Sequence, residues 1–180
     1  MSVAELELPA WSVTSPERRA HISRVTDLAL SWANAMRVDR ATRDAWRDAT
    51  LWHDALRDAV EAELRAIVPH LDWPTSLLHG PAAAIKLAED GERRTSVLEA
   101  IFWHTVGNAK WDRVGRVLYM ADFLEPGRRF ERRERAKLAA TVATDFDGSF
   151  REVVKRRLRD KVAAGDTLRT ETAALWQSVQ

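Results

Sequence analysis

Apolar residues along this chain recur every three or four positions, the spacing of an amphipathic α-helix. The first such segment begins at Ser15-Pro16-Glu17, where a capping serine precedes proline at the first helical position. The apolar face that follows is formed by Ile22, Val25, Ala29, Trp32 and Met36. His21 lies on the neighbouring stripe with Val25, Leu28 and Trp32. We therefore expect His21 to point into the protein near the start of this helix.

The same periodicity predicts helices in most of the remaining chain. We expect them at about residues 40–52, 80–87, 97–104, 114–122, 131–142, 146–163 and 170–179. Residues 67–78 contain two prolines and indicate an irregular or short-helical connection, with His79 just before the next helix. No segment alternates with period two for long enough to predict a strand. The predicted fold class is all-α.

Length and composition limit the possible classes of protein. A chain of 180 residues fits one domain, which we divide into an N-terminal extension (1–15), a core (16–130) and C-terminal helices packed on the same domain (131–180). The 28 basic and 27 acidic residues nearly cancel, so net charge gives no reason to expect nucleic acid as a partner. Residues 128–159 are rich in arginine; most of these side chains suit solvated helix faces, and some could meet phosphate.

Two absences are informative. The chain has no cysteine, which excludes thiolate catalysis, disulfides and cysteine-ligated zinc. Residues 1–7 lack the basic and apolar regions of a signal peptide, and no long apolar run follows. We therefore expect a cytoplasmic protein that does not enter a membrane.

The distribution of histidine and aspartate is the main clue to function. Each of the four histidines His21, His53, His79 and His104 lies at a predicted helix edge or beside a bulky apolar residue. Asp54 follows His53 directly, and Asp122 lies inside the apolar run of residues 117–123. A single histidine on an apolar face is usually a hydrogen-bonded core residue, but imidazole and carboxylate groups from several helices predict a metal centre. His70, in the irregular segment, has no such partner and is interpreted as a surface residue.

The order of these residues resembles that of HD-domain metal-dependent phosphohydrolases. The local sequences narrow the likeness to one bacterial family, the symmetrical bis(5'-nucleosyl)-tetraphosphatases, which split diadenosine tetraphosphate into two ADP. The matching motifs are Arg18-x-x-His21, His53-Asp54, His79-Gly80-Pro81, His104-Thr105-x-Gly107 and Ala121-Asp122-x-x-Glu125-Pro126-x-Arg128. The likeness is strong over residues 16–130 and looser beyond them.

The resemblance implies an HD-domain helical bundle with two divalent or mixed-valence metal ions in its core, with iron favoured over manganese, cobalt or zinc. The implied ligands are His21, His53, Asp54, His79, His104 and Asp122, with Asp54 bridging the ions. Paired ions can activate water and stabilise the charge of phosphoryl displacement. Nitrogen and oxygen ligands by themselves do not select one metal.

Asp54 and Arg57 are the expected catalytic residues. The expected substrate-binding residues are Arg18, Arg57, Thr105, Gly107, Trp111, Glu125 and Arg128, with Lys110 a weaker candidate. Glu125 is expected to hold Arg128 by an ion pair, and Trp111 to stack on a nucleobase. The family commonly has lysine where this chain has Arg57, so a planar guanidinium group replaces the compact ammonium group of lysine.

The expected partner is a nucleotide or dinucleoside polyphosphate, and the resemblance suggests a homodimer. Three alternatives stay open. The enzyme could act on another nucleotide, such as a guanosine polyphosphate, a dNTP or a nucleoside monophosphate. The pocket could instead belong to an inactive, nucleotide-binding regulatory module. A helical structural protein with coincidental histidines would bind no stoichiometric metal.

Overall fold

The computed structural model describes residues 7–180, and within this range every regular element is helical. Residues 1–6, which belong to the predicted N-terminal extension, lie outside the described residues. The elements are α1 (Pro16–Ala35), α2 (Arg40–Trp52), α3 (Glu61–Ile67), the 3₁₀ turn η2 (Thr75–Leu77), α4 (His79–Glu89), α5 (Thr95–Trp103), α6 (Arg113–Leu124), α7 (Arg132–Thr141), α8 (Phe146–Ala163) and α9 (Thr170–Ser178). The all-α prediction is confirmed.

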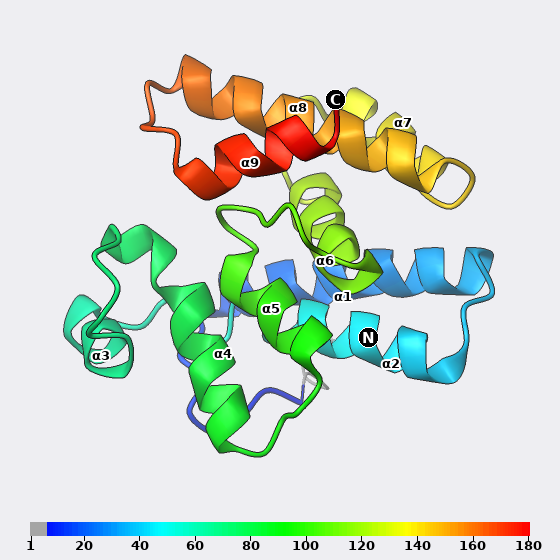
Figure 1. The fold of residues 1–180 in the computed structure, drawn as a ribbon. Coiled ribbons are helices and arrows are strands. Elements are labelled where there is room, and N and C mark those ends of the chain that lie inside the picture. The colour runs from blue at the N-terminus through cyan, green and yellow to red at the C-terminus, as the bar shows by residue number, and fades with distance from the viewer. Residues whose placement is uncertain (1–6) are drawn as a thin grey trace.

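Helix α6 is central to the arrangement (Figure 1). It packs against α1, α2 and α5 on one side and against α7 and α8 on the other. Helices α1 and α2 lie side by side, α4 packs on α5, and α7, α8 and α9 form the upper layer in Figure 1. One hydrophobic core runs through these layers, with residues such as Trp46, Ile101, Leu118, Phe150 and Leu175 fully enclosed.

Side-chain caps explain why several helices begin where they do. The Ser15 hydroxyl accepts a hydrogen bond from the backbone N–H of Arg18 at 3.2 Å, and Pro16 occupies the first turn of α1. Asp39, Asp112 and Asp145 cap α2, α6 and α8 in the same way. These local signals account for the good agreement between predicted and observed helix starts.

The structure differs from the sequence expectation at two points. Helix α3 was not predicted; only Leu64 of its seven residues is buried, so it has too little apolar periodicity to be recognised. His79 is the first residue of α4 rather than the residue before it. The irregular connection expected over 67–78 contains only the end of α3 and the short turn η2.

The segment before α1 is held against the end of α2. The backbone N–H of Val13 donates to the carbonyl of Ala55 at 2.8 Å, and that of Ser15 donates to the Asp58 carboxylate at 2.7 Å. These contacts bring the start of α1, which carries Arg18 and His21, next to the residues that follow α2.

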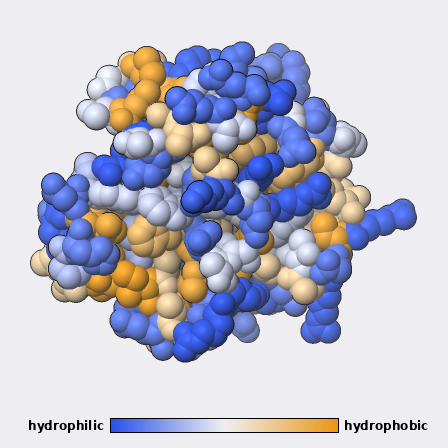
Figure 2. All heavy atoms as spheres, in the orientation of Figure 1, coloured by the Kyte–Doolittle hydropathy of each residue, from blue (hydrophilic) through white to orange (hydrophobic). Residues whose placement is uncertain are grey.

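The outer surface is mainly hydrophilic on the face shown in Figure 2. Apolar colour gathers at the lower left, over the region of α4, and at the turn between α8 and α9, where Val162 and Leu168 are exposed. Among the described residues, no helix combines the length and apolar character that a membrane span requires.

Helix α9 is attached to the turn between α5 and α6. The Thr172 hydroxyl donates to the carbonyl of Val106 at 2.7 Å, and the buried Leu175 side chain faces Gly107. Gly107 has φ +92°, a backbone conformation that residues with a side chain rarely adopt. A Cβ atom at this position would also overlap the Leu175 side chain. Gly107 therefore allows α9 to pack closely on this turn.

We predict that Gly107→Ala lowers the free energy of unfolding by about 2–5 kcal/mol. About 1–2 kcal/mol comes from left-handed backbone strain, and about 1–3 kcal/mol from crowding against Leu175. Gly91→Ala is the matched control, because Gly91 also has positive φ (+101°) but nothing lies near its Cβ position. Urea unfolding followed by circular dichroism measures both. Equal losses for the two variants would contradict a packing role for Gly107.

Candidate metal centre

Four histidines and one aspartate converge from the ends of four helices. His21 lies in the second turn of α1, His79 begins α4, and His104 follows α5 directly. His53 and Asp54 follow α2. All five side chains are buried. Groups that lie far apart in the sequence thus meet in one polar site inside the bundle.

The two oxygens of Asp54 face different histidine pairs. Oδ2 lies 3.7 Å from Nε2 of His21 and 3.5 Å from Nε2 of His53. Oδ1 lies 3.2 Å from Nε2 of His79 and 3.5 Å from Nε2 of His104. A carboxylate shared in this way is suited to bridging two neighbouring cations.

Backbone and carboxylate acceptors fix the orientation of three of these imidazoles. Nδ1 of His53 lies 2.8 Å from the carbonyl of Thr50, and Nδ1 of His104 lies 2.7 Å from that of Ile101. A carbonyl oxygen only accepts, so these Nδ1 atoms carry the proton and leave Nε2 with a free lone pair. Nδ1 of His21 faces Glu125 Oε1 at 3.2 Å and is oriented likewise. Metal-binding histidines are commonly held by such hydrogen bonds.

The donor set fits a metal. Nε2 of His53 and Nδ1 of His79 are buried without a hydrogen-bond partner in the described part of the chain. Unpaired buried polar atoms are costly, and a bound cation would satisfy those that face Asp54. Two groups have ligand atoms close enough to share an ion: His21, His53 and Asp54, and Asp54, His79 and His104. The site is therefore suited to divalent metal ions, and its nitrogen and oxygen donors do not select one.

Burial and neighbouring charges prepare these groups as ligands. Burial lowers the pKa of His53 to about 4 and also lowers the pKa of His79. Burial alone would raise the pKa of Asp54, but the close approach of the His53, His104 and His79 imidazoles outweighs it, leaving this pKa well below its usual range. Neutral imidazoles beside an ionised carboxylate are the forms that bind metals.

His21 has a different electrostatic environment. Burial would lower its pKa, but hydrogen bonding with Asp122 and Glu125 and the charges of Asp122 and Asp54 raise it instead. Asp122 Oδ1 lies 3.2 Å from His21 Nε2, on the same side as Asp54. Asp122 is thus next to the first ligand group, although it is not one of its three members.

Two arginines neutralise Asp122. Arg128 donates to Oδ1 at 2.5 Å, and Arg157, from α8, donates to Oδ2 at 3.2 Å. With the hydrogen bond of His21, they outweigh burial and hold the pKa of Asp122 well below its usual range. Arg157 was not predicted as a site residue, because no local motif links it to Asp122, 35 positions earlier.

Glu125 has a more specific role than the sequence suggested. Its carboxylate accepts from Arg24 Nε at 2.5 Å and from the backbone N–H of Gly127 at 2.6 Å, besides facing His21. Arg128 lies 3.7 Å from Glu125, farther than from Asp122. The expected ion pair between Glu125 and Arg128 is present, but Arg24 and His21 are the closer partners of Glu125. Arg24 was missed, although its position three residues after His21 places both on one face of α1.

A cavity of about 400 Å³ opens beside His21 and Glu125. Four arginines line it: Arg18, Arg24, Arg128 and Arg129. Arg18 also donates to Asp54 Oδ2 at 2.6 Å, so one lining residue of this cavity contacts the shared carboxylate. A cavity lined by several positively charged side chains is suited to an anionic ligand.

The remaining predicted site residues lie in different surroundings. Arg57 is half-buried and forms no ion pair with any carboxylate among residues 7–180. Thr105 has a buried hydroxyl without a partner in the same range, and Lys110 is exposed. Gly107 packs on Leu175.

Trp111 does not have the free aromatic face expected of a base-stacking residue. It is 4% exposed, and it packs on Gly115 and against Tyr119 with ring centroids 5.4 Å apart. Its indole N–H donates to the carbonyl of Glu99 at 3.3 Å. The stacking prediction for Trp111 therefore does not agree with its buried position.

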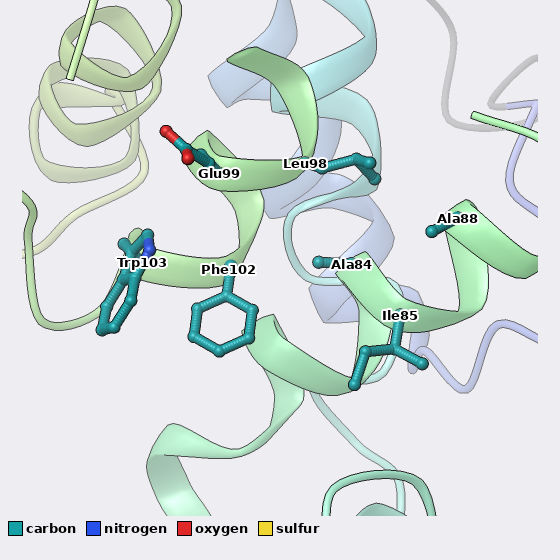
Figure 3. A pocket seen from close by; sticks show the side chains of 7 residues that line it. All are labelled: Ala84, Ile85, Ala88, Leu98, Glu99, Phe102 and Trp103. Atoms are coloured by element: carbon teal, nitrogen blue, oxygen red, sulfur yellow. The ribbon is translucent and has the colours of Figure 1, made fainter. Parts of the chain in front are cut away.

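A second hollow, of about 260 Å³, lies between α4 and α5 (Figure 3). Ile85, Leu98, Phe102 and Trp103 are among its lining residues, and Glu99 is the single charged one. Apolar walls and a negative charge do not suit phosphate. The arginine-lined cavity is the better candidate for a polyphosphate.

Comparisons with known proteins agree with these observations. No protein-family model matches the chain. A symmetrical bis(5'-nucleosyl)-tetraphosphatase from Halalkalibacterium halodurans is 26% identical over 140 residues, 73% of this chain and 72% of that protein. A protein of the same name from Bacillus subtilis is 27% identical over 121 residues, 63% of each chain. One from Staphylococcus aureus is 32% identical over 87 residues, 48% of this chain and 45% of that protein.

The fold has a solved counterpart. A crystal structure from Clostridium acetobutylicum, described as a predicted HD superfamily hydrolase involved in NAD metabolism, superposes with a TM-score of 0.75. It is 24% identical and covers 89% of this chain and 87% of its own. The chain therefore has the HD-superfamily hydrolase fold and resembles symmetrical bis(5'-nucleosyl)-tetraphosphatases in sequence.

We predict that Glu125→Gln weakens metal binding by about 10–100-fold, since the charge that orients His21 is removed. Competition with a chelator measures the affinity for Mn²⁺ or Zn²⁺. Glu134→Gln, on the exposed face of α7, is the matched control and is expected to bind as the unmodified protein does. An unchanged affinity in Glu125→Gln would contradict the proposed orienting role.

Proposed function

We propose that this protein, an HD-domain hydrolase by its fold and its sequence relatives, is a metal-dependent phosphohydrolase that cleaves dinucleoside tetraphosphates symmetrically. The observation that carries the proposal is the shared Asp54 carboxylate, with one histidine pair at each oxygen, next to an arginine-lined cavity. The names of the curated relatives support diadenosine tetraphosphate as the substrate.

Six residues would hold two ions: His21, His53, Asp54, His79, His104 and Asp122. Asp54 belongs to both groups of neighbouring ligand atoms, and iron is the favoured metal. Such ions, when bound, supply an activated water and stabilise the charge that develops during phosphoryl displacement. With water as the nucleophile, no serine, cysteine or other side chain would need to attack the phosphorus.

The other residues bind and orient the substrate. Arg18, Arg24 and Arg128 present guanidinium groups that can bind phosphate oxygens with two parallel hydrogen bonds. Arg18 and Arg128 now pair with Asp54 and Asp122. An incoming polyphosphate would compete for these guanidinium groups while the metals compensate the carboxylates.

Symmetrical cleavage requires that water add to one of the two inner phosphorus atoms. The bond between that phosphorus and the central bridging oxygen then breaks, and the oxygen departs with the other half. One dinucleoside tetraphosphate and one water thus give two nucleoside diphosphates.

Two other functions remain compatible with the same residues. An HD phosphohydrolase for another nucleotide would give different products from its own substrate. A regulatory module would bind nucleotide without turnover, although the complete set of histidine and aspartate ligands favours an enzyme.

We expect ADP to be the sole early product when the protein is incubated with diadenosine tetraphosphate and Mn²⁺, Fe²⁺ or Co²⁺. Ion-exchange chromatography separates ADP from ATP and AMP. Asp54→Ala is expected to abolish turnover, because it removes the group shared by both ligand sets. His70→Ala is the control, since His70 is exposed. Formation of ATP plus AMP would exclude symmetrical cleavage, and metal-independent turnover would exclude the mechanism.

The role of Arg57 is tested by changing its charge and its shape separately. Arg57→Ala is expected to lower kcat/KM by about 10–100-fold, because a charge-assisted hydrogen bond to phosphate contributes about 1.5–3 kcal/mol. Arg57→Lys is expected to retain most of the activity. The control is Arg65→Ala, whose guanidinium pairs with Glu61 on the surface of α3. Full activity in Arg57→Ala would remove Arg57 from the site.

A further inference from the structure

A second cationic cavity, of about 300 Å³, lies on the far side of Asp122 from His21. It is formed by the loop after α6 together with α7 and α8. Five cationic side chains and two carboxylates line it. The two carboxylates, Asp122 and Asp160, are already engaged by arginines, Asp122 by Arg128 and Arg157 and Asp160 by Arg159. The cavity therefore carries positive charge that its own acids do not neutralise.

Arg135 is the clearest unpaired cation in this cavity. It is 9% exposed, and within residues 7–180 it forms no ion pair with a carboxylate. Its Nε is buried without a hydrogen-bond partner in the same range. The guanidinium donates to the carbonyl of Phe123 and stacks on the Phe123 ring, 3.8 Å from its centroid. A buried charge with an unused donor is costly unless an anion binds it.

Lys161 adds a second poorly compensated charge. Its nearest carboxylate partner is Asp166, at 4.0 Å. Burial lowers the pKa of Lys161, and the charge of Arg157 lowers it further; burial and the charge of Arg128 act on Arg135 in the same direction. Both side chains thus lie in a positive potential that an anionic ligand would relieve.

This cavity and the one beside His21 are joined by shared walls. Arg128, Arg129 and Phe130 line both. The His21–Asp122 contact lies between the cavities, because His21 lines one and Asp122 the other. Phe130 is 80% exposed, so a large aromatic face is available at their junction.

We propose that the cavity lined by Arg135, Arg157 and Lys161 is a second diphosphate subsite, which holds one half of the dinucleoside tetraphosphate while the cavity of Arg18 and Arg24 holds the other. This inference rests on the proposed function. The central bridging oxygen of the substrate would then lie near the His21–Asp122 pair, with one nucleoside diphosphate in each direction. Such a placement explains why a symmetrical substrate would be cut at its centre.

The test is the number of ADP molecules that the metal-loaded protein binds, measured by isothermal titration calorimetry. Two ADP per chain are expected for the unmodified protein. Lys161→Ala and, independently, Arg135→Lys are expected to weaken one of the two sites at least fivefold and to leave the other unchanged. Lys155→Ala removes the same charge from the exposed face of α8, outside the cavity, and is expected to bind two ADP per chain as the unmodified protein does.

A single ADP site in the unmodified protein overturns the inference. Two ADP sites of unchanged affinity in both Lys161→Ala and Arg135→Lys overturn it as well. Arg135→Lys keeps the buried charge, and Lys161 is only half-buried, so at least one folded variant is expected. The diadenosine tetraphosphate assay separates this inference from the proposed function. Turnover with one ADP site would leave the proposed function intact and exclude the second subsite. Two ADP sites without turnover would exclude the proposed function and, with it, the assignment of the second site to one half of the substrate.

Discussion

The arrangement of the site depends on balancing the negative charge of one buried carboxylate, that of Asp54. Asp54 is 4% exposed, and its two oxygens are surrounded by the Nε2 atoms of four histidines. A buried negative charge is unstable without such partners. The ends of α2 and α5 and the starts of α1 and α4 must therefore meet at one point. The polar contacts before α1 and the packing of α6 against α1, α2 and α5 hold these ends together.

The same electrostatic requirement extends outward to the arginines. Arg18 pairs with Asp54, Arg24 with Glu125, and Arg128 with Asp122. These guanidinium groups stabilise the carboxylates and also line the cavity beside them. Cations bound among the histidines would take over part of that stabilisation. The arginines would then be available to an anionic ligand.

The C-terminal helices take part in the site through a few long-range contacts. Arg157 of α8 donates to Asp122 and stacks on the buried ring of Tyr119, 4.0 Å from its centroid. Arg135 of α7 donates to the carbonyl of Phe123. α9 is fixed by Thr172 and Leu175 at the turn after α5. The C-terminal helices thus complete the surroundings of the α6 carboxylate as well as covering the core.

Much of the fold could be predicted from local sequence. Serine and aspartate caps and the apolar periodicity specify most helix starts, as at Ser15 and Asp39. Helix α3 could not be predicted, because it buries only Leu64. The candidate ligands were identifiable because imidazole and carboxylate groups recur beside apolar residues in several predicted helices and the His53-Asp54 pair is local. Arg24 carried a weaker signal, its helical spacing from His21.

The sequence by itself determined the all-α class, most helix starts and the identity of the metal-binding candidates, since these depend on side-chain type and on spacing along one helix. Tertiary structure alone decided how the two oxygens of Asp54 are divided between histidine pairs. It also decided that Glu125 faces His21, that Trp111 is buried, and that Arg157 contacts Asp122. The physical reason is the same in each case: these contacts connect residues from different helices, and only the packing of those helices brings their side chains within hydrogen-bonding distance or excludes them from solvent.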